Sequence, residues 1–152
     1  EVDLANTSVK KAFKDVSKDF KKAFDKKIEV YEDYYAKDSE VVVVVLSSSA
    51  GTVKEVVDDL RKKNISVGLL KPRLYRPFLY EEYRKAFKNA KKIIVLDRSF
   101  GYGSVPPLYK DIKICVSEFS RKIDVYSFVY GIGGRDFYYK DAEEIIMNVI
   151  KN

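Results

Sequence analysis

Residues 40–46 read EVVVVVL, with five consecutive valines between a glutamate and a leucine. A strand with one face in water alternates apolar and polar residues, whereas this run is apolar from Val41 to Leu46. Such a run is typical of a strand that is buried on both faces. It therefore predicts a central strand of a sheet that helices cover on both sides.

The chain beyond this strand alternates between helix-like and strand-like patterns. Apolar residues spaced three and four apart predict helices over residues 53–63, 80–90, 107–121 and 140–152. Short apolar runs predict further strands of the same buried kind within residues 64–75, 91–97 and 122–130. This alternation is typical of an α/β fold with a mostly parallel sheet.

The segment before residue 40 departs from that alternation. Apolar spacing over residues 8–24 predicts a helix, and we expect Thr7 or Ser8 to cap its start. Residues 28–35, IEVYEDYY, alternate in part and predict a first strand. Only AKDS separates this strand from the valine run, which is too short for a crossover helix. We therefore expect the first strand to run antiparallel to the others.

The composition excludes several kinds of chemistry. The 152 residues contain no histidine, which excludes histidine-based acid–base catalysis, Ser-His-Asp triads and histidine metal sites. Cys115 is the single cysteine and lies in an apolar stretch, so a buried, inert thiol is favoured over a reactive one. No apolar run is long enough to cross a membrane and no signal peptide is visible, so we expect a cytoplasmic location.

The net charge of +6 has a local source. Residues 10–27 hold eight lysines and three aspartates. A basic patch can attract nucleic acid, but no aromatic or arginine-rich pattern accompanies this one, so a solvated helix face is favoured. Abundant lysine and glutamate without histidine or tryptophan suggest a thermophilic source. Because the chain begins with Glu1 rather than methionine, we expect a piece of a longer or processed chain.

Four loops are expected at the carboxyl ends of the parallel strands, where open α/β sheets bind ligands. The first, SSSAGT (47–52), lacks the spaced glycines and the lysine of a Walker loop, and we expect Ser48, Ser49 or Thr52 to cap the next helix. The others are residues 73–78, 97–105 and 131–139.

The stretch YGIGGRD (130–136) contains Gly131, Gly133 and Gly134. A dinucleotide fingerprint reads GxGxxG, and Asp136 stands where its last glycine belongs, so a negative charge would repel a pyrophosphate. We interpret this loop instead as a surface on which Arg135 and Asp136 form salt bridges with a neighbour.

Charged residues mark two further strand ends. Asp97 is a candidate general base beside Arg98, although no partner acid or metal ligand is near it in the sequence. Arg73 and Arg76 are expected either to bind a carboxylate or phosphate or to pair with acids across an interface.

Taken together, four motifs resemble the 2-oxoacid:ferredoxin oxidoreductases. The motifs are SSSAGTVKEVVDDLR (47–61), VGLLKPRLYRPF (67–78), VLDRSFGYG (95–103) with its following PL, and YGIGGRD (130–136). Each is weak alone, but their order and spacing are similar to the second domain of the alpha subunit in the pyruvate:ferredoxin oxidoreductase (pyruvate synthase) family. The resemblance runs from about Val16 to the end. The family usually has a glycine near Ser47 and Ser48, and often Gly-Pro in place of Pro106 and Pro107, which bears on loop geometry.

The resemblance implies a fold similar to the transketolase carboxy-terminal domain, with a three-layer α/β/α arrangement and a mixed five-stranded sheet that has one antiparallel strand. It implies that residues 1–27 lead in from a preceding thiamine-binding domain and that residues 28–152 form the α/β domain. Thiamine diphosphate, Mg²⁺, iron–sulfur clusters and most of the coenzyme A contact belong to other domains. This chain is then expected to bind no cofactor or metal alone, to carry no catalytic residue, and to be inactive in isolation.

The implied function is assembly of the complex that converts a 2-oxoacid, with pyruvate favoured, and coenzyme A into acyl-CoA, CO₂ and reduced ferredoxin in anaerobic metabolism. The interface candidates are Arg73, Arg76, Asp97, Arg98, Gly131, Gly133, Gly134, Arg135 and Asp136.

Three alternatives stay open at this point. The chain could be the equivalent domain of a pyruvate dehydrogenase beta subunit or a transketolase, although RPF followed by LDR favours the ferredoxin-dependent family. It could be a stand-alone small-anion-binding module that uses Arg73, Arg76 and the serine loop. The least favoured alternative is a nucleic-acid binder that uses the basic first helix.

Overall fold

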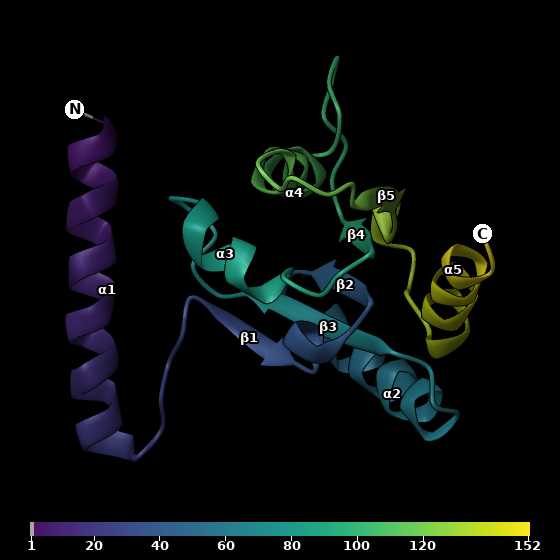
Figure 1. Cartoon of the computed structure of the whole chain (residues 1–152), viewed down its shortest axis with the longest axis horizontal. Coiled ribbons are helices and arrows are strands. Elements are labelled where there is room, and N and C mark those ends of the chain that lie inside the picture. Colours follow the sequence, from purple (N-terminus) through teal and green to yellow (C-terminus); the bar gives the residue numbers. More distant parts are fainter. Residues whose placement is uncertain (1) are drawn as a thin grey trace.

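A computed structural model describes residues 2–152 and contains one five-stranded sheet with helices on both faces (Figure 1). The strands are β1 (Tyr31–Tyr34), β2 (Val41–Val45), β3 (Val67–Pro72), β4 (Lys92–Asp97) and β5 (Asp124–Val129). The helices are α1 (Val2–Phe24), α2 (Ser49–Lys62), α3 (Tyr80–Ala86), α4 (Pro107–Ser117) and α5 (Tyr139–Lys151). Two short 3₁₀ turns, η1 (Ala36–Asp38) and η2 (Ile132–Gly134), complete the chain.

The strand order is β1-β3-β2-β4-β5, and β2 lies at the centre, as its valine run predicts. Val43 of β2 pairs in parallel with Leu69 of β3 on one side and with Ile94 of β4 on the other. β1 pairs antiparallel with β3, where Tyr31 lies opposite Pro72. The expectation of one antiparallel strand in a mixed five-stranded sheet is confirmed.

The return from β1 to β2 crosses the amino end of β3. Because β3 lies between β1 and β2, the η1 turn must pass over it. Gly68 makes room for this crossing, since a Cβ atom at that position would lie 2.5 Å from the carbonyl carbon and oxygen of Tyr35. A side chain there would collide with backbone, which cannot rotate away.

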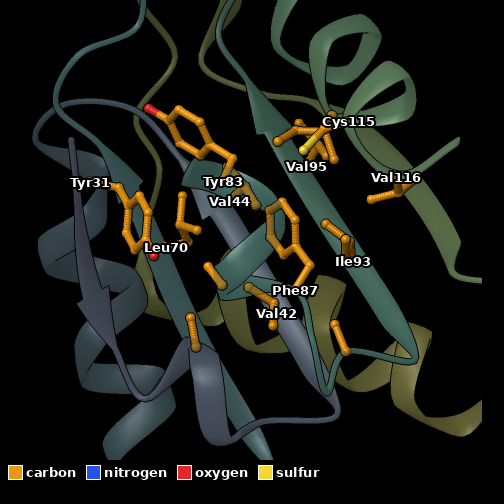
Figure 2. Close-up of a cluster of buried hydrophobic side chains, with 14 of the residues drawn as sticks. Tyr31, Val42, Val44, Leu70, Tyr83, Phe87, Ile93, Val95, Cys115 and Val116 are labelled. Carbon is orange, nitrogen blue, oxygen red and sulfur yellow. The ribbon is translucent and has the colours of Figure 1, made fainter. Parts of the chain in front are cut away.

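Two apolar layers flank the sheet. Val42 and Val44 point into a cluster with Tyr83 and Phe87 of the α3 segment and Cys115 of α4 (Figure 2). Val41, Val43 and Val45 point into the opposite cluster, which α2 and α5 cover. Every residue of β2 is therefore buried, in agreement with the prediction from its unbroken valine run.

The prediction that β5 is a strand of the same buried kind is wrong. Its residues are half-buried, and Ser127 is exposed. β5 is the last strand in the order and pairs only with β4, so one of its sides has no neighbouring strand. The apolar character of KIDVYSFVY does not distinguish an edge strand from a central one.

The predicted start of the first helix is also wrong. α1 begins at Val2, so Thr7 and Ser8 lie inside the helix and neither is its cap. The apolar spacing predicts which residues share a helix face, but no breaker before residue 7 ends the helix there. Pro107 is the first residue of α4, where proline is tolerated.

Candidate functional site

The carboxyl ends of β2, β3, β4 and β5 lie along one margin of the sheet, which we call the carboxyl edge. The loops after these strands therefore emerge side by side. At the centre of this edge lies a cavity of about 240 Å³. Its lining residues come from the start of α2 and from the loops after β4 and β5, and they are Ser48, Ser49, Thr52, Arg98, Arg135, Asp136 and Phe137.

Two arginines from different loops share this cavity. The Nε atom of Arg98 donates a hydrogen bond to the carbonyl oxygen of Gly131 at 3.3 Å, which joins the two loops. Within the described residues, neither Arg98 nor Arg135 forms an ion pair with a carboxylate. Both side chains belong to exposed residues, so their guanidinium groups are open to a partner.

The glycine loop has a backbone that most side chains would strain. Gly131, Gly133 and Gly134 have φ angles of 63°, 68° and 80°, in the left-handed region. A Cβ atom on Gly131 would also lie 2.9 Å from Nε of Arg98. The glycines thus shape the loop that presents Arg135.

Asp136 does not pair with Arg135. Its Oδ2 atom instead accepts a hydrogen bond from the hydroxyl of Tyr138 at 2.8 Å, and this bond raises the pKa of that phenol. The sequence places Arg135 and Asp136 together, whereas the structure leaves the arginine available and ties the aspartate to its own loop.

The serine loop does not cap α2 as predicted. Ser48 stands at the cap position with helical φ and ψ angles of −69° and −31°, and no side-chain hydrogen bond closes the helix start. Capping requires an extended backbone at that position, which explains the difference. Ser49 is engaged elsewhere, because its Oγ accepts a hydrogen bond from the hydroxyl of Tyr130 at 2.9 Å. Ser47 has a φ angle of 63°, a conformation that glycine adopts more readily.

Asp97 positions a loop rather than facing the cavity. It is buried, and its Oδ2 atom accepts a hydrogen bond from the backbone N–H of Leu108 at 2.8 Å. Its Oδ1 atom accepts another from the hydroxyl of Ser99 at 3.1 Å. These contacts hold both ends of the segment between β4 and α4, which supports a structural role and gives no support to a general base.

Arg73 and Arg76 lie away from the cavity, and each has a carboxylate partner. Arg73 contacts Glu32 at 2.9 Å, and Glu32 also pairs with Lys54, whose hydrogen bond lowers the pKa of this carboxyl. Arg76 lies 2.8 Å from the buried carboxylate of Asp111. Because each arginine already contacts a carboxylate, the structure does not favour a small-anion site built from these two side chains.

Tyr75 shows how Arg76 is held. The guanidinium stacks on the Tyr75 ring, with its carbon 3.9 Å from the ring centroid, and donates a hydrogen bond to the Tyr75 hydroxyl at 3.0 Å. Burial, with a contribution from the nearby charge of Asp111, raises the pKa of Tyr75 to about 12. Arg76 thus finds its contacts in Tyr75 and Asp111, within its own part of the fold.

Cys115 is fully buried, as predicted. Burial raises the pKa of its thiol to about 12, so the reactive thiolate is disfavoured. Over residues 7–152, the range whose side chains the structure describes, no three Cys, Asp or Glu side chains come together in a set suited to a metal ion. In the same range, no helix combines the length and apolar character that crossing a bilayer requires.

Exposed aromatic side chains lie at the carboxyl edge, and the sequence patterns above do not predict them. The segment between β4 and α4 projects away from the body (Figure 1). It carries Phe100, which is 56% exposed, and Tyr102, which is 99% exposed. The alternation of glycine and aromatic residues in FGYG, at the end of a strand, could have predicted this exposure. Glycine has no side chain against which a neighbouring ring could pack.

Comparisons with known proteins agree on one family. The pyruvate:ferredoxin oxidoreductase core domain II family matches residues 39–142. Pyruvate synthase subunit PorA of Thermotoga maritima is 39% identical over 132 residues, which cover 87% of this chain and 34% of that relative. Ketoisovalerate oxidoreductase subunit VorA of Pyrococcus abyssi is 34% identical over 148 residues, or 97% of this chain and 38% of the relative. The chain thus spans just over a third of the length of these curated relatives.

A solved structure shares the fold. It is 2-oxoglutarate:ferredoxin oxidoreductase from Magnetococcus marinus with 2-oxoglutarate, coenzyme A and succinyl-CoA bound. The TM-score is 0.55 at 22% sequence identity, over 88% of this chain and 21% of that one.

Proposed function

The chain belongs to the pyruvate:ferredoxin oxidoreductase core domain II family, and from this membership we propose that it is a non-catalytic domain that helps to assemble a 2-oxoacid:ferredoxin oxidoreductase. The proposed complex depends on thiamine diphosphate and converts a 2-oxoacid and coenzyme A into acyl-CoA, CO₂ and reduced ferredoxin. Pyruvate is the proposed 2-oxoacid because the relative from Thermotoga maritima is a pyruvate synthase subunit. Residues 1–27 are proposed to lead in from a thiamine-binding domain.

The proposed cofactors belong to other parts of the complex. An iron–sulfur cluster takes four cysteine thiolates, and this chain has the single, buried Cys115. The described residues also offer no clustered ligands that fit Mg²⁺. The proposed contribution of this chain is therefore to hold neighbouring parts in place.

The observation that carries the proposal is the composition of the carboxyl edge. Arg98 and Arg135 line its cavity without a carboxylate partner among the described residues, and Phe100 and Tyr102 are exposed on the segment that follows Arg98. Aromatic and arginine side chains are the residues that most often dominate the energy of protein–protein interfaces. We propose that this edge contacts another part of the complex.

Replacing Arg135 by alanine in the full-length subunit tests this proposal. Because Arg135 is exposed and forms no ion pair with the part of the chain that the structure describes, we expect an unchanged melting temperature but assembly weakened about tenfold or more. Co-purification with the partner subunits and gel filtration measure assembly. Lys88→Ala, at the opposite edge before β4, removes one exposed cation as a matched control.

Normal assembly of the Arg135→Ala subunit would contradict the proposal. Tight binding of inorganic phosphate to the intact subunit, lost on the same substitution, would instead identify the cavity as a small-anion site.

A further inference from the structure

α1 stands beside the α/β body and contacts it along one side (Figure 1). Lys10 forms ion pairs with Glu81 at 3.3 Å and with Glu82 at 3.0 Å in α3. The hydroxyl of Ser17 donates a hydrogen bond to the carbonyl oxygen of Ile28, in the segment that leads into β1. Because Lys10 and Ser17 are separated by about two helical turns, they mark the side of α1 that faces the body.

A different side of α1 is apolar. Val9 and Val16 each precede one of the two contact residues by one position, so they lie about 100° around the helix from the side that faces the body. Steps of three and four residues place Val9, Ala12, Val16, Phe20 and Ala23 on one face. We call this face the apolar stripe.

The apolar stripe is largely open to water in the part of the chain that the structure describes. Val16 is 62% exposed, Ala12 and Ala23 are also exposed, and the other two members are partly buried. The ring of Phe20 lies 4.6 Å from that of Phe24, measured between centroids, and Phe24 is 63% exposed. Phe24 therefore adjoins the stripe and enlarges its apolar surface.

The body itself gives α1 little packing. A groove of about 450 Å³ remains between the helix and the segments that it faces. Helices in proteins gain most of their stability from packing of an apolar face, and exposed apolar surface is unfavourable in water. The stripe therefore indicates a further neighbour on a side of α1 that the body does not cover.

The size of the stripe favours a neighbour from the same polypeptide. Interfaces between separate proteins involve about 20–30 residues on each side, whereas the stripe and Phe24 offer six. Separate molecules also lose translational and rotational freedom when they bind. A segment of the same chain avoids most of this loss, because the linker keeps its effective concentration near the stripe high.

A longer subunit has enough chain to supply this neighbour. These residues span just over a third of the length of the curated relatives. A lipid surface also accepts amphipathic helices, but two of the five members of the stripe are alanines, which offer it little apolar area.

We propose that the apolar stripe of α1 packs against a part of the same subunit that lies outside these 152 residues. This proposal rests on the function proposed above, in which residues 1–27 lead in from another domain. α1 then contacts the α/β body through Lys10 and Ser17 and the other part through the stripe, so it fixes how the two parts are oriented.

Cysteine labelling of the full-length subunit, without its partner subunits, tests the proposal. Val16→Cys places a thiol on the stripe, and Lys11→Cys is the matched control about 140° away on the polar side of α1. Both positions are exposed within these 152 residues. We expect a maleimide to label position 16 about tenfold more slowly than position 11 in the folded subunit and equally fast in urea, as measured by mass spectrometry of the peptides.

A polar substitution gives an independent readout. Val16→Gln should weaken the contact of the stripe and speed trypsin cleavage after Lys26 or Lys27, between α1 and β1, about threefold or more. Lys11→Gln, on the polar side of the helix, should leave the rate of cleavage at these two lysines unchanged.

Equal labelling of positions 16 and 11 in the folded subunit would overturn the proposal and leave the assembly role standing. Protection of position 16 that appears only with partner subunits, only at concentrations where the subunit dimerises, or only with vesicles of anionic phospholipid would also overturn it, since the neighbour would then lie outside the subunit. Protection of position 16 together with normal assembly of the Arg135→Ala subunit would support this proposal and contradict the assembly role alone.

Discussion

At position 68 the absence of a side chain allows the chain to return across the sheet. The η1 turn lies directly on Gly68, and the backbone atoms of Tyr35 and Ala36 occupy the space that a Cβ atom would need. The requirement is steric and does not come from an unusual φ angle. The crossing that places β1 antiparallel to β3 therefore depends on the absence of a side chain at position 68.

Gly68→Ala should therefore destabilise the protein. A Cβ atom 2.5 Å from the carbonyl of Tyr35 forces the η1 turn away from β3, and we expect a loss of about 3 kcal/mol in the free energy of unfolding. Urea denaturation measures this loss. Gly51→Ala is the matched control, because a Cβ atom there meets nothing within 4 Å and alanine favours the helix, which should stabilise by about 0.5 kcal/mol. Equal effects of the two substitutions would contradict the steric explanation.

At the scale of elements, the same residue type has different roles in β2 and α1. Val43 lies in the central strand and is 0% exposed, whereas Val16 lies on α1 and is 62% exposed. The sequence pattern marks both as apolar positions of a buried face. Only β2 has layers on both of its faces that complete the burial.

Val43→Ala should cost about 2–3 kcal/mol, because two methyl groups are lost from a packed layer and leave a cavity. Val16→Ala should change the free energy of unfolding by less than about 0.5 kcal/mol, since little burial is lost and alanine has the higher helix propensity. Chemical denaturation of both variants checks the pair. A large loss for Val16→Ala in the isolated chain would mean that α1 packs on the body more tightly than its exposure indicates.

At the scale of the whole molecule, burial of groups that ionise at high pH makes stability depend on pH. Burial raises the pKa of Cys115 from 9.0 to about 12, and burial raises that of Tyr75 from 10.0 to about 12. In the unfolded chain these groups lose their protons near their ordinary values, whereas the folded protein retains them. The unfolded state thus binds fewer protons above pH 9, and stability falls as the pH rises toward 12.

We expect the free energy of unfolding to be level between pH 7 and pH 8.5 and to decrease between pH 9 and pH 11. Cys115→Ala should be less stable at every pH because of the cavity it leaves, but its decrease above pH 9 should be shallower by the contribution of one thiol. Urea midpoints over this pH range measure both slopes. A decrease as steep in Cys115→Ala as in the parent would show that the thiol is not responsible.

Much of the architecture follows from local patterns in the sequence. The valine run predicts a strand buried on both faces, and the short AKDS connection predicts the antiparallel first strand, since four residues are too few for a crossover α-helix. The edge position of β5 does not follow from its composition, because an apolar strand looks the same at an edge as at a centre. The serines of the 47–52 loop look like caps, but Ser48, which holds the cap position, has helical backbone angles and makes no capping hydrogen bond.

The candidate site, like the fold, could be predicted from the sequence only in part. Residue type and position at strand ends are enough to identify Arg98, Arg135 and the glycine loop as candidates. The same reasoning also selects Arg73 and Arg76, because a sequence does not reveal that Glu32 and Asp111 lie within ion-pair distance of them. These partners come from distant segments that only folding brings together. Local preferences of the backbone depend on neighbouring residues in the sequence. The pairing of charges and the exposure of a helix face depend instead on which elements pack against one another.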